Sequence, residues 1–99
     1  MKTKNIGGGI FNSNCAEILQ PIKFKNGTLK VEPDYFNDTH HLYFDNKSLA
    51  NHPNGYSCHS LAMRLVSGDK NKIKEQADYI VRCGGEVDYT FLEELQKID

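Results

Sequence analysis

The stretch His52–Leu65, HPNGYSCHSLAMRL, divides the chain into a part with strand-like patterning and a part with helical patterning. Its Pro-Asn-Gly sequence is typical of a turn, because these residues favour the backbone angles that turns require. Ser57 follows as an N-cap candidate, since its hydroxyl can accept a hydrogen bond from a free amide at the start of a helix. The apolar side chains after it recur at helical spacing and predict a helix over 57–67: Cys58, Leu61, Ala62 and Leu65.

Two more helices are expected downstream of this stretch. Gly68 suits the end of the first helix, and Asp69 suits the N-cap of a second one over 70–83. The sequence Thr90-x-x-Glu93 has the spacing of a capping box and predicts a short last helix over 90–98. The intervening Gly84–Asp88 reads as a link between these helices.

Upstream of His52 the patterning predicts strands. Asn26-Gly27 suits a two-residue hairpin turn, which predicts a hairpin over 22–32 with Lys23 directly opposite Lys30. A further strand is expected over 40–44, and residues 48–57 read as a loop. Strands followed by helices predict an α+β fold, in which a short antiparallel sheet is covered on one face by three C-terminal helices.

Length and composition favour one domain over residues 1–99 in the cytoplasm. The chain carries 38% hydrophobic residues and a formal net charge of −1, which is within the range of folded proteins. No apolar stretch long enough for a signal peptide or a membrane span follows the start of the chain. The three cysteines, Cys15, Cys58 and Cys83, are widely spaced, which predicts reduced thiols rather than a disulfide framework.

Cys58 is the candidate for thiol chemistry. A thiol at the start of a helix can be acidified by the helix dipole, and such an enzyme also needs a histidine oriented by an acid or an amide. The order His41, then Asp45, then an Asn-Gly-x-x-Cys turn resembles the ubiquitin-like-protein protease and acetyltransferase-effector superfamily of cysteine enzymes, over His41 to about Leu65. The resemblance implies Cys58 as nucleophile, His41 as base and Asp45 as orienting acid. The alternative is a core thiol, because Cys58 is in phase with the apolar side of its helix.

Neither a metal site nor a cofactor is predicted. Four histidines and Cys58 occur within a short part of the chain, but His40-His41 and Cys58-His59 are adjacent pairs whose side chains diverge in a strand or helix. The three glycines at 7–9 lack the spacing of a phosphate-binding loop.

Two surfaces are candidates for binding a partner. One is a lysine face of the hairpin, and the other is the segment Asp34–Asp45, where aromatic residues alternate with acids, as at interfaces with basic partners. Strand alternation predicts that Phe44 points inward and Tyr43 outward. The candidate partner-binding residues are Lys23, Lys25, Lys30, Asp34, Tyr35, Phe36, Asp38, Tyr43 and Asp45.

The sequence therefore favours a small non-catalytic protein that binds another macromolecule. The expected partner is a protein or a protein–nucleic-acid complex, and the size and composition suggest a regulatory or inhibitory protein of phage or mobile-element type. The alternatives are a minimal cysteine-dependent hydrolase or acyltransferase using Cys58 and His41, and direct binding of a nucleic-acid backbone by the lysine face. No membrane association is expected, and neither the partner's identity nor the oligomeric state follows from the sequence.

Overall fold

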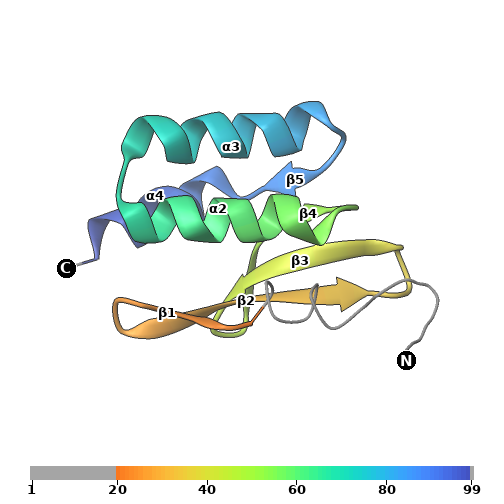
Figure 1. The fold of residues 1–99 in the computed structure, drawn as a ribbon, viewed down its shortest axis with the longest axis horizontal. Coiled ribbons are helices and arrows are strands. Elements are labelled where there is room, and N and C mark those ends of the chain that lie inside the picture. Colours follow the sequence, from red (N-terminus) through yellow and green to blue (C-terminus); the bar gives the residue numbers. More distant parts are fainter. Residues whose placement is uncertain (1–19, 99) are drawn as a thin grey trace, which may run out of the picture.

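The chain forms a five-stranded antiparallel sheet with helices on one side of it (Figure 1). The computed structural model describes residues 20–98, and the glycines at 7–9 and Cys15 lie outside this range. The strands follow each other across the sheet in chain order. The elements are β1 (Ile22–Phe24), β2 (Gly27–Asp34), β3 (Thr39–Phe44), β4 (Lys47–His52), α2 (Gly55–Ser67), α3 (Lys70–Arg82), β5 (Glu86–Val87) and α4 (Tyr89–Lys97). The predicted α+β class is confirmed.

The β1–β2 hairpin forms, but in a different register from the expected one. Ile22 pairs with Leu29 and Phe24 with Gly27, so the turn residues are Lys25 and Asn26. Lys25 adopts a φ of 54°, whereas Gly27 is a strand residue. Gly27 is needed because a Cβ there would lie 2.4 Å from Cζ of the Phe44 ring. The glycine therefore permits close packing of an aromatic ring rather than an unusual turn angle.

Two strands lie where the sequence indicated loops. β4 is missed because the pairing with β3 contains an irregularity at Leu42/Tyr43, which lets two successive residues, Leu49 and Ala50, both be buried. That arrangement removes the alternation expected of a strand. β5 has two residues and pairs with β4 through Val87 and Glu86, which is too short for a periodic pattern.

The helices lie close to their expected positions, although two caps differ. Asn54, rather than Ser57, caps α2 by accepting a hydrogen bond from the Tyr56 amide. Asp88, rather than Thr90, caps α4, while Asp69 caps α3 as expected. Gly68 ends α2 with a φ of 78°, which is the left-handed conformation that glycine adopts readily.

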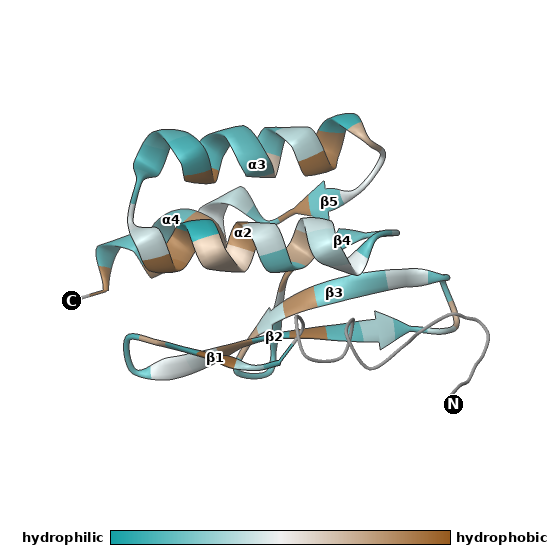
Figure 2. Ribbon diagram, in the orientation of Figure 1, coloured by the Kyte–Doolittle hydropathy of each residue, from teal (hydrophilic) through white to brown (hydrophobic). Residues whose placement is uncertain are grey.

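A hydrophobic core lies between the helices and one face of the sheet. In Figure 2 the apolar residues of the helices form short bands between hydrophilic ones, as in amphipathic helices. Leu42, Cys58, Leu61 and Ile80 are each 0% exposed. The opposite face of the sheet, called the open face below, is not covered by any helix in residues 20–98 (Figure 1). Its side chains are polar or aromatic: Lys23, Lys30, Glu32, Asp34, Thr39, His41, Tyr43, Ser48 and Asn51.

Candidate functional site

Cys58 is a core residue. Its side chain is 0% exposed, and its thiol donates a hydrogen bond to the carbonyl oxygen of His40 at 3.6 Å. Burial raises the pKa of the Cys58 thiol from an ordinary value of 9.0 to about 12. The position at the first turn of α2 therefore does not acidify the thiol, because removal from water outweighs the helix dipole.

The residues proposed to act with Cys58 lie elsewhere. His41 is next to the fully buried Leu42 in β3, so strand alternation turns its ring to the open face, away from α2. Asp45 lies in the β3–β4 turn, where its carboxylate accepts a hydrogen bond from the Thr28 amide at 3.1 Å. The structure does not bring these three side chains together.

The histidines are also dispersed. The His40 ring bonds the Pro53 carbonyl at 3.0 Å, and the His52 ring stacks on Tyr79 with ring centroids 6.2 Å apart. His59 is partly buried in α2, and loss of solvent lowers the pKa of its imidazole. Among residues 20–98, no three histidine, cysteine or acidic side chains are grouped so that they could hold a metal ion.

The expected three-lysine surface is not formed. Lys23 lies opposite Thr28 rather than Lys30, and Lys30 pairs with Glu32 at 3.0 Å. Lys25 is in the hairpin turn, away from the open face. Its ammonium group donates to carbonyl oxygens at the end of α4: Leu95, Gln96 and Ile98. Lys25 thus acts as a contact between the hairpin and α4.

Two aromatic side chains project from the turn between β2 and β3, which we call the β2–β3 tip (residues 34–38). Tyr35 is 90% exposed and Phe36 is 95% exposed. The backbone around them is held by Asp34, whose carboxylate accepts from the Asn37 amide at 3.1 Å and from its side-chain nitrogen at 2.8 Å. Asp38 completes the turn in the left-handed conformation, with a φ of 58°. The tip is therefore an ordered turn that presents two large apolar groups to solvent.

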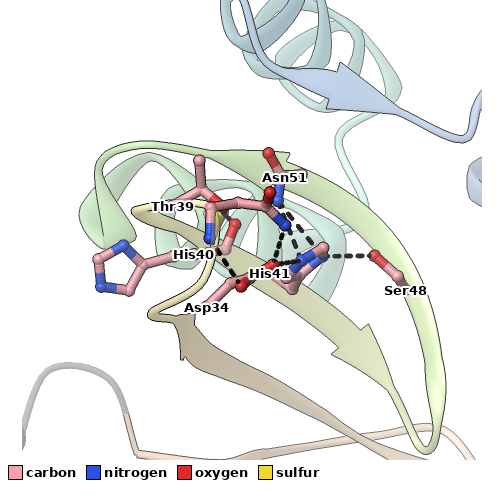
Figure 3. A network of polar contacts seen from close by, with 8 residues as sticks. Asp34, Thr39, His40, His41, Ser48 and Asn51 are labelled. Carbon is pink, nitrogen blue, oxygen red and sulfur yellow. Dashed lines mark hydrogen bonds and ion pairs between the residues drawn. The ribbon is translucent and has the colours of Figure 1, made fainter.

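A polar cluster on the open face supports this tip (Figure 3). Nε2 of His41 lies 2.9 Å from the Asp34 carboxylate, and Nδ1 lies 3.0 Å from the Ser48 hydroxyl. The Asn51 amide lies 3.1 Å from Nε2 and donates to the Thr39 hydroxyl at 2.9 Å. The His40 ring points away from the cluster, so only the second histidine of the pair takes part.

Asp34 connects the cluster to the tip. Hydrogen bonds from Asn37 and then from His41 lower the pKa of the Asp34 carboxyl to about 2. The carboxylate is therefore ionised at neutral pH, which is the form that can accept all of these hydrogen bonds. Loss of its charge would weaken the turn and the contact with His41 together.

Asp34, His41 and Ser48 follow the order of acid, base and hydroxyl used by serine hydrolases. Acyl transfer also needs unengaged donors for the developing oxyanion. The amide nitrogen of Asn51, which lies beside the imidazole, donates to the Thr39 hydroxyl. In this structure the cluster positions Asp34, and through Asp34 it holds the backbone of the tip.

Sequence reasoning found part of this site. It identified Asp34, Tyr35, Phe36 and Asp38 as candidates. The predicted directions of Tyr43 and Phe44 are confirmed. The Tyr43 ring stacks on the His41 ring on the open face, with centroids 5.4 Å apart, and Phe44 packs against the core. Asp45 belongs to a different surface, because it lies at the other end of β3 from the tip. Thr39, Ser48 and Asn51 were missed. Only the pairing of β3 with β4 could have shown that Ser48 and Asn51 share a face with His41.

No family model, no curated protein and no solved structure matches the chain. In the described part of the chain, the helices are too short or too polar to cross a bilayer.

Proposed function

We propose that this protein acts by binding another macromolecule, and that the β2–β3 tip is the contact that inserts into the partner. The observation that carries the proposal is the near-complete exposure of Tyr35 and Phe36 on a turn whose backbone is fixed by Asp34. The two exposed aromatic side chains are adjacent and are flanked by polar residues, and an exposed apolar patch with a polar rim is typical of an interaction site.

Aromatic anchors and a fixed backbone both favour tight association. Tyrosine is enriched among the residues that dominate interface energies, and buried aromatic side chains contribute a large apolar area. A turn that is ordered before binding loses less conformational entropy on association than a flexible loop. The tip therefore has the two properties expected of an anchor, since apolar area is exposed and the backbone is already ordered.

The charges beside the anchors indicate the chemistry of the partner. Asp34 and Asp38 flank the two aromatic side chains, and no lysine or arginine lies in the tip itself. An apolar pocket bordered by basic residues would match this arrangement. Such a pocket belongs to a protein, alone or within a protein–nucleic-acid complex. A regulatory or inhibitory role, as in small proteins of phage or mobile elements, would follow if the pocket is one that the partner needs for its own function.

The test compares partner capture by three forms of the protein in lysate of the native host, followed by quantitative mass spectrometry. The tip variant is Tyr35→Ala/Phe36→Ala. The matched control is Met63→Ala/Val66→Ala, which removes two exposed apolar side chains from α2. We expect the wild type and the control to retain the same specific partner and the tip variant to lose it. Equal retention by the tip variant would refute the proposal.

A second measurement tests the charges. Asp38→Asn removes a charge while keeping a residue that tolerates the left-handed conformation. We expect slower association and a weaker dependence of the association rate on salt, with little change in dissociation. An unchanged rate at low salt would contradict the assignment of a basic partner surface.

A further inference from the structure

Two histidines bind the peptide unit that joins Pro53 to Asn54, immediately before α2. Nδ1 of His40 lies 3.0 Å from the Pro53 carbonyl oxygen, and Nδ1 of His52 lies 2.9 Å from the Asn54 amide nitrogen. The two histidines are paired with each other across β3 and β4. Gly55 leaves room for the His40 ring, because a Cβ there would lie 3.0 Å from Cδ2 of that ring. Since Asn54 is the N-cap of α2, the two histidines hold the start of this helix.

The two contacts require opposite protonation states at Nδ1. A carbonyl oxygen only accepts hydrogen bonds, so Nδ1 of His40 carries a hydrogen and donates it to Pro53. A backbone amide only donates, so Nδ1 of His52 carries no hydrogen, and the hydrogen of the neutral ring is on Nε2. Uptake of a proton therefore leaves the His40 contact intact and abolishes the His52 contact.

The surroundings of the His52 ring also disfavour its protonated form. His52 is only 6% exposed, and its Nε2 is buried without a hydrogen-bond partner in the described part of the chain. A protonated ring would have a second unsatisfied N–H group, because the new hydrogen on Nδ1 would face the amide hydrogen of Asn54. It would also carry a positive charge into the interior, which is unfavourable unless an acidic group lies close by.

The residues around His52 do not supply such an acidic group. Within residues 20–98 no carboxylate is in ion-pair distance of the ring. Asp78 in α3 binds Lys74 and Tyr89, and the exposed Glu86 of β5 is opposite the neighbouring residue Asn51. The other titratable or charged side chains near the ring are His40 in β3, Cys58 in α2, Tyr79, which stacks on the ring, and Arg82 and Cys83 at the end of α3.

We propose that the Pro53–Asn54 turn is a pH-sensitive switch, which holds the start of α2 while His52 is neutral and releases it when His52 takes up a proton. His40 keeps its contact with Pro53 in both states, so the release is confined to the Asn54 side of the turn. An imidazole in water takes up a proton below about pH 6.5, so the stabilisation is present above this pH and decreases as the pH falls. The switch acts on α2 and does not depend on whether the β2–β3 tip binds a partner.

The experiment follows the full chain by NMR from about pH 7.5 to about pH 5. At the higher pH, long-range proton–nitrogen spectra should show the Nε2–H tautomer for His52 and the Nδ1–H tautomer for His40. Hydrogen exchange, corrected for its intrinsic pH dependence, should show that protection of the Asn54 amide decreases by up to about thirtyfold at about pH 5, where nearly all imidazole in water is protonated. The Ser57 amide, which donates to the Asn54 carbonyl, should follow it, while the Gly68 amide at the other end of α2 should stay protected.

Two matched variants identify the histidine responsible. His52→Asn places an amide oxygen near the position of Nδ1, so the Asn54 amide should keep a partner and its protection should not change with pH. His40→Asn places an amide N–H near its own Nδ1 position and should lose protection at low pH as the wild type does. The proposal is overturned if wild-type His52 is the Nδ1–H tautomer or if wild-type protection at Asn54 is independent of pH. It is also overturned if His52→Asn keeps the pH dependence or if His40→Asn abolishes it. The wild-type measurements decide the outcome even where a variant does not fold.

Discussion

The two faces of the sheet differ in how their side chains are held. The covered face is formed by apolar side chains such as Leu42, which is 0% exposed beneath the helices. The open face is held by directed contacts, in which His41 lies between Asp34 and Ser48. Apolar burial tolerates some change of partner, because it depends on area rather than direction. The polar cluster requires the strands to be in one register, and this register is what places the tip.

The largest expected difference between a buried and an exposed position is in the rates at which the two thiols, Cys58 and Cys83, are alkylated. In a Cys15→Ser background, iodoacetamide should modify the exposed Cys83 rapidly, while Cys58 should react only when the protein unfolds. For a domain stable by about 5 kcal/mol, the Cys58 rate should be lower by at least about a thousandfold. Mass spectrometry of the labelled peptides measures both rates. Comparable labelling of Cys58 and Cys83 in the folded protein would restore the thiol-enzyme hypothesis.

The Cys58 thiol also makes the free energy of unfolding depend on pH in the alkaline range. Since the folded pKa of Cys58 is raised from 9.0 to about 12, the unfolded state loses its proton first as pH rises. The Cys58 contribution is therefore complete below pH 9.0 and is lost progressively between pH 9.0 and about 12. Urea unfolding across this range should show a decline that is smaller in Cys58→Ala. An equal decline in that variant would mean that other groups cause it.

Leu42→Ala should have the largest effect on stability among single changes in β3. Truncation of a fully buried leucine leaves a cavity and costs about 3 kcal/mol in the free energy of unfolding. The matched control is Tyr43→Ala on the open face, which loses the stacking on His41 and should cost about 1 kcal/mol. Urea denaturation of both variants measures the difference. Similar costs would mean that the open face is covered and packed like the core.

Acid should release the tip before it unfolds the domain. The Asp34 carboxyl has its pKa lowered from 3.8 to about 2, so its contribution is present above pH 3.8 and is lost as pH falls toward 2. The amide signal of Asn37, which donates to Asp34, should shift over this range while core signals of Leu42 keep their positions. Asp34→Asn should abolish the titration. Simultaneous loss of both signals would show that tip and core are one cooperative unit.

The sequence predicted those features that depend on local chemistry. Asp69 was identified as a cap and Gly68 as a helix end because each acts through its own side chain or backbone angle. The periodicity that placed Cys58 on the apolar side of its helix also predicted its burial correctly. Tyr35 and Phe36 were named as candidate contacts, but the turn that exposes them was not predicted from the sequence.

The features that were missed depend on contacts between distant residues. Asn26-Gly27 gave a sound turn signal, but the register is fixed by Phe44, whose ring leaves no room for a side chain at Gly27. The strand β4 was missed because Leu49 and Ala50 are buried in succession. With β4 unrecognised, the contact between Ser48 and His41 could not be foreseen.

The smallest expected effect distinguishes an isolated ion pair on the open face from the polar cluster beside it. Lys30 and Glu32 approach to 3.0 Å, but their side chains are 41% and 49% exposed. A double-mutant cycle with Lys30→Ala and Glu32→Ala should give a coupling of about 0.5 kcal/mol or less, and salt should reduce it further. The Asp34–His41 contact should show the larger coupling, because the same carboxylate also holds the backbone of the tip and each loss weakens the other. Equal coupling in the two cycles would show that His41 is an ordinary surface partner of Asp34, and the tip would then owe its order to the turn alone.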